Sequence, residues 1–271
     1  MTHLSSNLSL TRRTLAALLA SMTFAWAAAP ETAHARAGIS DGALTQQDAS
    51  LVMPLKAGQV LDIVLTHPRL GREGREARSM FDARVLPLME ERPFALSGRV
   101  GVQDTIIGKT YASDVEFHVY PDTRTKRALD GDRNWSEMRD YRAEGWRRLD
   151  AFSVVIPADL EMRFDPAKSY TLAIAWTHPA NPGDYDRYLD GVASEFEAVG
   201  ARFAHRFRDI AFTTRSGDRP IPPAQIVIVE WNDEEGLQKL LTSDAYRDHA
   251  AFFRTGVSDF QFYRLSSPTV S

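Results

Sequence analysis

The chain of 271 residues contains no cysteine, so disulfides, thiolate metal sites and thiol catalysis are all excluded. The short motifs that name a reaction are missing as well: there is no GxSxG, no P-loop, no HExxH and no glycine-rich dinucleotide fingerprint. After residue 37 no apolar run approaches the roughly 20 residues that span a membrane. The fold must therefore be held together by its hydrophobic core, and no motif assigns a function.

The N-terminus has the composition of an export signal. Arg12 and Arg13 precede an uncharged stretch over residues 14–29, and small residues follow at 33–37. The uncharged stretch is shorter than the roughly 20 residues of a membrane-spanning helix, which argues against a permanent anchor. The segment from Thr11 to Leu15 is similar to the core of a twin-arginine signal. We predict that residues 1–37 are an export signal and that the mature chain is a soluble periplasmic protein with no membrane anchor.

The charge that remains after cleavage is small and negative. Removing residues 1–37 leaves 271 − 37 = 234 residues, enough for one large or two small domains. The same removal takes away three arginines and one glutamate, so the formal charge changes from 32 − 36 = −4 to 29 − 35 = −6. A mildly acidic chain with scattered charges of both signs is poorly suited to following a phosphate backbone. Nucleic acid is therefore not expected as a partner.

An internal repeat is the strongest signal in the sequence. The tripeptide Thr-His-Pro closes two β-rich segments, at 66–68 and at 177–179, a separation of 177 − 66 = 111 residues. A repeat of this length indicates a duplicated domain, since solenoid units repeat about every 20–50 residues. We predict an N-terminal linker at 38–56, a first unit at 57–156, a linker at 157–168 and a second unit at 169–271. The same separation relates further pairs of similar size or backbone role: Tyr120 and Trp231, Trp135 and Tyr246, Gly145 and Gly256, Leu129 and Leu240, and Phe152 and Tyr263.

Both halves show the same order of predicted secondary structure. The apolar, β-rich segments 60–67 and 170–178 are each followed by a helix, marked in the second half by apolar residues at helical spacing from Tyr185 to Val199. Two strands, a second helix and a last strand complete each half, which gives a β-α-β-β-α-β ferredoxin-like unit. Because the strands are apolar on both faces and the helices cover only one, the two bare faces are expected to pack together. The predicted fold is α+β, with two tandem ferredoxin-like units forming an intramolecular pseudo-dimeric α/β barrel.

This pattern resembles the dimeric α/β-barrel superfamily. The second half is similar to an uncharacterised family in which a strand, a helix, a Ser-x-x-Tyr segment and an arginine follow one another, here as Ile226–Trp231, Ser243–Tyr246 and Arg254. The first half departs from the pattern, because Ala143 stands where the arginine would be matched. The superfamily includes cofactor-free monooxygenases, isomerases and haem enzymes, so the resemblance implies the fold and leaves the reaction open.

The histidines of the two Thr-His-Pro segments are the first candidates for chemistry. The imidazoles of His67 and His178 can transfer protons near neutral pH, whereas two histidines are too few for a metal site, and none is predicted. The more common role is structural, with each ring closing the end of a strand. His118 and His205 alternate with apolar neighbours in strands, where a histidine is a general base, an axial haem ligand or an ordinary packed residue.

Four residues of the second half are candidates for binding a substrate. Arg254 and Tyr246 are predicted to orient an anionic or carbonyl oxygen. Trp176 and Trp231 are predicted to favour a flat, apolar ligand if they line a pocket, although aromatic residues at such spacing are usually part of a core.

The sequence as a whole predicts a periplasmic α/β-barrel protein that binds a small aromatic or apolar molecule. It would act as a cofactor-free monooxygenase, isomerase or lyase, with no cofactor of its own. The alternatives are a haem-dependent enzyme of the same fold and a non-catalytic binding or assembly protein. The substrate, the reaction and the oligomeric state are left open.

Overall fold

The computed structural model describes residues 50–91, 93–132, 138–214 and 221–268. The export signal predicted at 1–37 lies outside these residues. The described residues belong to one compact unit that extends from Thr45 to Ser271. None of the described helices has both the length and the apolar composition needed to cross a membrane.

Nine strands form one antiparallel sheet in the order β8-β10-β7-β11-β3-β4-β2-β5-β9. The α+β class predicted from the sequence is confirmed, because helices and antiparallel strands follow one another in both halves. The first half contributes β2 (Val60–Pro68), α2 (Arg72–Glu91), β3 (Ala95–Ile107), β4 (Asp114–Tyr120), α3 (Thr123–Asp130), α5 (Arg139–Gly145) and β5 (Trp146–Val155). The second half contributes β7 (Ser169–Thr177), α6 (Asp184–Ala198), β8 (Ala201–Phe207), β9 (Ala211–Thr214), β10 (Gln225–Trp231), α7 (Gly236–Thr242), α8 (Asp244–Gly256) and β11 (Val257–Pro268).

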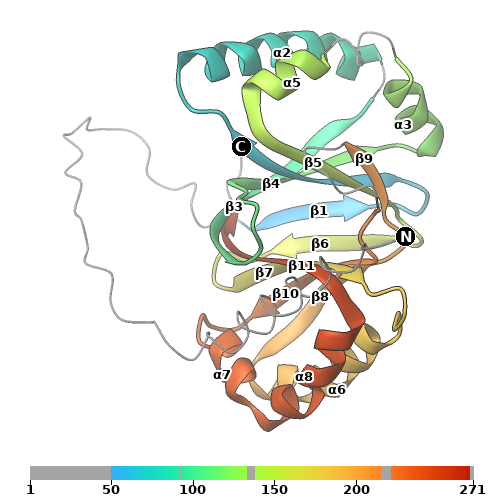
Figure 1. Cartoon of the computed structure of the whole chain (residues 1–271). Coiled ribbons are helices and arrows are strands. Elements are labelled where there is room, and N and C mark those ends of the chain that lie inside the picture. Colours follow the sequence, from blue (N-terminus) through green and yellow to red (C-terminus); the bar gives the residue numbers. More distant parts are fainter. Residues whose placement is uncertain (1–49, 92, 133–137, 215–220, 269–271) are drawn as a thin grey trace, which may run out of the picture. The chain divides into compact units, whose positions relative to one another are not determined.

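The two halves arrange their strands alike. Within the sheet the first half reads β5-β2-β4-β3 and the second reads β11-β7-β10-β8. With the short strand β9 left aside and the four strands of each order numbered along the chain, both orders are fourth, first, third, second. Figure 1 shows α2, α3 and α5 on the outer side of the first group of strands and α6, α7 and α8 on the outer side of the second.

The halves meet through strand pairing and through a common core. β3 pairs with β11, and β5 pairs with the short strand β9, so each half lends a strand to the edge of the other. The strand faces that carry no helices contribute to one buried cluster, which includes Leu61, Ile63, Leu65, Val115, Phe117 and Phe152 from the first half and Leu172, Ile174, Trp176, Ile226, Ile228 and Tyr263 from the second.

A buried polar network also connects the halves. The guanidinium of Arg148 on β5 donates to Asp150 at 2.6 Å, to the hydroxyl of Tyr263 at 2.7 Å and to Oε1 of Gln261 at 2.8 Å. Arg148 is 2% exposed, and its charge is held by a carboxylate and by neutral acceptors from the other half. A buried charge is tolerated only when it is paired and hydrogen-bonded in this way.

The two segments predicted as linkers each contain a strand. β1 (Leu51–Leu55) lies in 38–56 and β6 (Leu160–Phe164) lies in 157–168, and they pair with Met53 opposite Met162. One face of this two-stranded ribbon belongs to the common core, and Figure 1 shows the ribbon between the two groups of strands. A Cβ at Gly98 would lie 2.7 Å from Sδ of Met53, so the glycine permits the close approach of β3 to the ribbon.

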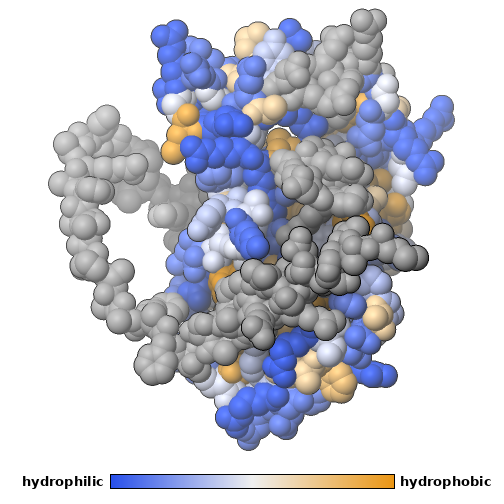
Figure 2. Space-filling view, in the orientation of Figure 1, coloured by the Kyte–Doolittle hydropathy of each residue, from blue (hydrophilic) through white to orange (hydrophobic). Residues whose placement is uncertain are grey.

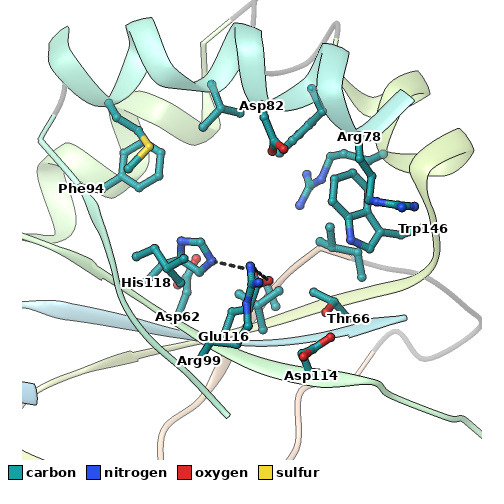
Figure 3. A pocket seen from close by; sticks show the side chains of 18 of the residues that line it. Asp62, Thr66, Arg78, Asp82, Phe94, Arg99, Asp114, Glu116, His118 and Trp146 are labelled. Atoms are coloured by element: carbon teal, nitrogen blue, oxygen red, sulfur yellow. Dashed lines mark hydrogen bonds and ion pairs between the residues drawn. The ribbon is translucent and has the colours of Figure 1, made fainter. Parts of the chain in front are cut away.

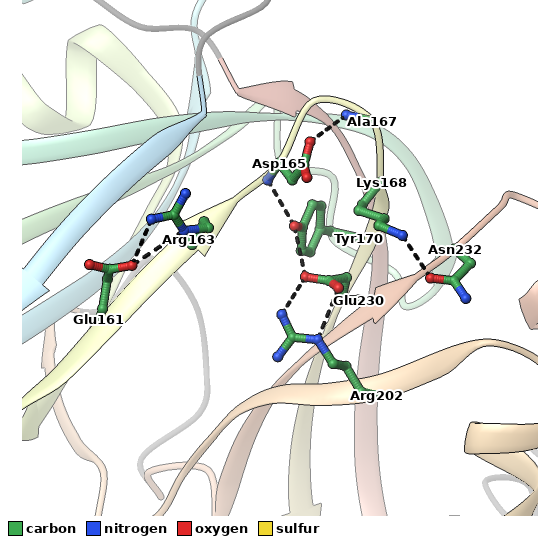
Figure 4. A network of polar contacts seen from close by, with 9 residues as sticks. All are labelled: Glu161, Arg163, Asp165, Ala167, Lys168, Tyr170, Arg202, Glu230 and Asn232. Carbon is green, nitrogen blue, oxygen red and sulfur yellow. Dashed lines mark hydrogen bonds and ion pairs between the residues drawn. The ribbon is translucent and has the colours of Figure 1, made fainter.

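Polar contacts fix the turn after the ribbon to the second half (Figure 4). The hydroxyl of Tyr170 accepts from the backbone amide of Asp165 at 2.8 Å and donates to Glu230 at 3.0 Å. Arg202 holds the same carboxylate with two hydrogen bonds, at 2.9 and 2.7 Å. Burial, followed by the bond to Glu230, raises the pKa of Tyr170 to about 12, so the hydroxyl remains a donor.

The strand register corrects the equivalence of the two Thr-His-Pro segments. Asp62 pairs with His118, and Thr171 pairs with Val229. The β4 and β10 positions therefore differ by 229 − 118 = 111 residues, whereas β2 and β7 differ by 171 − 62 = 109. The amide of His178 accordingly donates to Gly256 in the place where the amide of Arg69 donates to Gly145. The two tripeptides are thus displaced by two residues with respect to the sheet.

The ribbon should be part of the cooperative core. Phe164 is 1% exposed and packs on Phe117 and Tyr170, with ring centroids 5.6 and 5.0 Å apart. We expect Phe164→Ala to lower the free energy of unfolding by about 3–5 kcal/mol in urea denaturation. The neighbouring exposed residue provides the control, and Arg163→Ala should change it by less than about 0.5 kcal/mol. Equal effects of the two substitutions would contradict the packing of the ribbon.

Candidate functional site

A cavity of about 610 Å³ lies in the first half, between the sheet and the helices α2 and α5. Figure 3 shows α2 as its roof and the strands as its floor. Apolar side chains of α2 recur at helical spacing along the roof, at Phe81, Val85 and Met89. The other lining residues are Asp62, Val64, Thr66, Pro68, Arg78, Asp82, Phe94, Leu96, Arg99, Asp114, Glu116, His118, Tyr120, Lys126, Arg142, Trp146, Leu149 and Ala151.

A chain of three charged or polar side chains crosses the floor. Arg99 forms an ion pair with Oε1 of Glu116 at 2.7 Å, and Nε2 of His118 lies 3.2 Å from Oε2 of the same carboxylate. Burial alone would raise the pKa of Glu116, but the hydrogen bond to His118 and the charges of His118 and Arg99 outweigh it and lower the pKa. Glu116 is therefore ionised and holds the imidazole of His118 in a fixed orientation.

Two further carboxylates face the cavity from opposite sides. Asp82 lies on α2 in the roof and Asp114 lies at the start of β4 in the floor (Figure 3). Burial is the main cause that raises the pKa of each group, and the charge of Glu116 adds to it, while Arg99 acts in the opposite direction. Neither carboxylate receives a hydrogen bond from the residues that the structure describes.

The inner end of the cavity contains an ionic cluster in which Lys126 and Asp62 are buried and Asp130 is exposed. Nζ of Lys126 lies 3.2 Å from Asp62 and 2.7 Å from Asp130, and Ser153 donates to the second oxygen of Asp62. The ammonium of Lys126 also lies 5.0 Å from the ring centroid of Tyr120. Burial, reinforced by the charges of Asp62 and Asp130, strongly raises the pKa of Tyr120, so its hydroxyl is neutral.

The second half has an apolar core in the corresponding place. By strand register, Val227 corresponds to Glu116, Val229 to His118 and Thr171 to Asp62. In the same way Phe262 corresponds to Ala151. These positions face a buried cluster that fills the space between sheet and helices, formed by Ala173, Val192, Phe196, Ala201, Val227, Val229, Trp231, Leu237 and Leu240, with Phe260 and Phe262 packed against it. The polar cavity is therefore a feature of the first half, and its second-half counterpart is packed.

The two histidines nominated from the sequence are not among the residues that line the cavity. His67 is half-buried and its Nδ1 lies 2.9 Å from the hydroxyl of Ser113. His178 is half-buried as well, and its Nδ1 accepts from the amide of Ala180 at 3.2 Å. These contacts suit the structural role at the ends of strands, and the catalytic role remains a prediction.

The four residues predicted to bind a substrate are not brought together. Trp176 belongs to the common core and donates to the carbonyl of Ile221 at 2.9 Å. Trp231 belongs to the apolar core of the second half and donates to Thr171 at 3.0 Å. Tyr246 on α8 is half-buried against Tyr188, with ring centroids 6.3 Å apart, and Arg254 on the same helix is exposed.

The other two strand histidines differ from each other. His118 lies in the floor of the cavity, on the face opposite to the common core that contains its neighbour Phe117. His205 is half-buried and stacks on Phe207 at 5.9 Å, and burial lowers its pKa to about 4, so that it is uncharged at neutral pH. Of the strand histidines weighed from the sequence, His118 is the one placed among convergent polar groups.

The residues that sequence reasoning missed carry a recognisable signal. Asp62 interrupts an otherwise apolar strand, and Glu116 and His118 alternate with the buried Val115 and Phe117. A charged side chain in a strand that is covered on both faces lowers the free energy of unfolding unless it is paired or hydrogen-bonded. Its presence therefore indicates a partner or a functional site. That pattern identifies one strand face as polar, although it does not identify Asp82 or Arg99 as the groups that lie opposite or beside it.

The donor set does not favour a metal or a haem group. Among the described residues no cluster of three or more His, Asp and Glu side chains could hold a metal ion. A haem needs a histidine nitrogen directed to its iron and apolar surfaces on both of its faces. Here the carboxylates of Asp62, Asp114 and Glu116 line the floor, so that side of the cavity is not an apolar surface. The residues present therefore do not fit haem, and no step is derived through it.

No family model matches the chain, and no curated protein matches it in sequence. Similar solved structures include an anthrone oxidase-like protein, with a TM-score of 0.46 and 8% identity over 80% of this chain and 95% of that chain. A candidate monooxygenase from Fusobacterium nucleatum has a TM-score of 0.39 and 9% identity over 80% and 94% of the two chains. A mutant chlorite dismutase from Candidatus Nitrospira defluvii has a TM-score of 0.40 and 10% identity over 79% and 93%. The TM-scores of these three structures are below 0.5, so the likenesses carry no functional assignment.

The charges of Glu116 and Asp114 should change the free energy of unfolding in opposite directions. Because the pKa of Glu116 is lowered, its charge stabilises the fold above the ordinary value of 4.5, and this contribution is lost as the pH falls through the lowered pKa. Because the pKa of Asp114 is raised, its charge destabilises the fold at pH 7, and this cost disappears as the pH falls through the raised pKa toward 3.8.

We therefore expect Glu116→Gln to lower the free energy of unfolding at pH 7 by about 2 kcal/mol, since it removes charge-assisted hydrogen bonds. Asp114→Asn should raise it, and in urea denaturation this difference should shrink between pH 7 and pH 4. The difference caused by Glu116→Gln should persist down to 4.5 and shrink only below that pH. Asp190→Asn, on the exposed face of α6, is the matched control and should leave the free energy of unfolding nearly unchanged. A loss of stability in Asp114→Asn comparable to that in Glu116→Gln would contradict the assignment.

Proposed function

We propose that the chain binds a small, largely apolar or aromatic molecule in the cavity of the first half and acts on it by proton transfer. The observation that carries the proposal is the chain Arg99–Glu116–His118 in the floor of a 610 Å³ cavity, with the apolar side chains of Phe81, Val85 and Met89 in its roof. A volume of this size lies within the range of about 300–1,000 Å³ that is usual for small-molecule sites. Apolar walls with a few convergent polar groups are also typical of such sites.

His118 is the proposed proton carrier. Glu116 is ionised and engages Nε2 of the imidazole, while Arg99 holds Glu116 from its other oxygen. For Nδ1 the described residues offer no hydrogen bond, so this nitrogen can accept a proton from a C–H or O–H group of the ligand. The proton moves to the ring, the electron pair stays on the ligand, and Glu116 stabilises the imidazolium that forms.

Three reaction classes begin with this step. An isomerase returns the proton to a different atom of the ligand, and a lyase expels a leaving group from the anion. A cofactor-free monooxygenase lets the anion react with dioxygen. The cavity supports the shared step, and the fate of the anion depends on the ligand.

We also propose that the two halves arose by duplication and form an intramolecular pseudo-dimeric barrel. The identical strand orders, the reciprocal pairing of β3 with β11 and β5 with β9, and the common core support this proposal. In such an arrangement the first half contains the site and the second half is its packed counterpart.

Two substitutions separate binding from catalysis. Ala151→Phe introduces the residue found at the corresponding second-half position, Phe262. It should fill the cavity and abolish the thermal shift caused by a ligand from a panel of small aromatics.

His118→Asn should keep the ligand's Kd within a few-fold and lower its turnover by about 10²–10⁴-fold. Binding that survives Ala151→Phe would place the site elsewhere, and unchanged turnover in His118→Asn would exclude it as the base. A Soret band in purified protein would contradict the cofactor-free mechanism.

We propose further that the protein is exported to the periplasm by the twin-arginine route. The composition of residues 1–37 supports this proposal. The double substitution Arg12→Lys, Arg13→Lys should retain the chain in the cytoplasm, as measured by fractionation and immunoblotting of bacteria that express the full chain. The control is Arg247→Lys on the exposed part of α8, which should leave export unchanged. Equal amounts of both variants in the periplasm would contradict the twin-arginine route.

A further inference from the structure

The charges at one end of the cavity do not balance. Asp82, Asp114 and Glu116 are three carboxylates that line the same cavity, and the charge of Glu116 acts on each of the other two. The cations that act on them are Arg78 and Arg99. This part of the cavity therefore has a formal charge of 2 − 3 = −1 among the described residues when His118 is neutral.

Both arginines at this end of the cavity already have partners within the protein. Arg99 is already paired with Glu116 at 2.7 Å. Arg78 donates through NH1 to the carbonyl oxygens of Arg69 at 2.7 Å and Gly145 at 2.9 Å, which joins the start of α2 to the end of α5. Both arginines hold the walls of the cavity in place, and the carboxylates of Asp82 and Asp114 face the cavity without a donor from the described residues.

The inner end of the cavity is neutralised by its own groups. Lys126 is bonded to Asp62 and to Asp130, and the charges of Asp130 and Asp62 also act on Arg142. An anionic ligand would have to compete with these carboxylates for Lys126. The region between the roof and the floor, near Asp82 and Asp114, therefore has a negative net charge and favours a cationic group.

Aromatic side chains border the same position. Trp146 follows α5 and contacts Phe81 of α2 edge to face, with ring centroids 5.2 Å apart. Figure 3 shows Trp146 and Arg78 at the same end of the cavity, with Asp82 above and Asp114 below. A cation beside an aromatic face and a carboxylate gains from both, by about 0.5–2 kcal/mol for the aromatic contact alone.

We propose that the ligand of this cavity carries a protonated amine, which binds between Asp82 and Asp114 while its apolar body lies against Trp146 and Phe81. This inference rests on the proposed function, because it assigns a charge to the molecule that the cavity binds. The cavity supplies the site, and the two carboxylates determine which sign of charge it accepts. The second half provides the contrast, since the position of Asp114 is occupied there by the neutral Gln225.

Three probes with the same ring system and different charges test the proposal: tryptamine, the neutral alcohol tryptophol and the anion indole-3-propionate. Isothermal titration at pH 7.5 should show tryptamine binding at least tenfold tighter than the other two probes. Asp114→Asn and Asp82→Asn should each weaken tryptamine at least tenfold, since a charge-assisted hydrogen bond is lost, and Asp190→Asn should leave it unchanged. Raising the salt concentration from 50 to 500 mM should also weaken tryptamine, and tryptophol should be insensitive.

The outcomes separate this inference from the proposed function. Indole-3-propionate or tryptophol binding as tightly as tryptamine, with all binding abolished by Ala151→Phe, would overturn the cationic ligand and leave the cavity as the site. Tryptamine binding that is unchanged in both carboxylate variants would do the same. Absence of binding by all three probes, or binding that Ala151→Phe does not affect, would overturn the inference and remove the support for a site in this cavity.

Discussion

The central strands of this protein bury both of their faces, and this constraint governs the rest of the structure. On one face, Leu61, Ile63 and Leu65 of β2 pack into the core that both halves share. On the other face the helices must provide the cover. Where that face is apolar, as in the second half, helices and sheet close into a core. Where it carries Asp62, Glu116 and His118, the charges need polar partners and space, and a cavity separates α2 from the sheet.

Much of the fold could be predicted from the sequence because it depends on periodic patterns. The repeat and the order of strands and helices gave the α+β class, and both halves have the same strand order. The register could not be predicted in this way, since hydrogen bonds with neighbouring strands determine it. The Thr-His-Pro match suggested one constant offset, but His67 corresponds in the sheet to Trp176, and His178 corresponds to Arg69. A matching tripeptide at a strand end does not fix the pairing of the strand.

The candidate site could be predicted only in part. Histidines at the ends of two apolar strands favour His67 and His178, whereas His118 has the pattern of an ordinary packed strand residue. Segment 60–67 is predicted from its composition to be apolar on both faces, although Asp62 near its centre indicates that one face is polar. The convergence of Asp82 from α2 with Asp114 from β4 depends on tertiary packing, because 32 residues separate them (114 − 82). No local pattern in the sequence places these two carboxylates on opposite sides of one cavity.

The asymmetry of the two halves follows from their shared stability. Partly desolvated carboxylates with raised pKa values, such as Asp82 and Asp114, reduce the stability of a folded chain at neutral pH, and a small unit alone has little stability to lose. Here the first half shares its inner core with the second, and the Arg148 network and the ribbon strengthen the junction. The packed second half therefore contributes stability to the same cooperative body that contains the charged cavity. Because the destabilising charges lie in one half and the compensating apolar packing in the other, the chain needs both halves although only the first contains the candidate site.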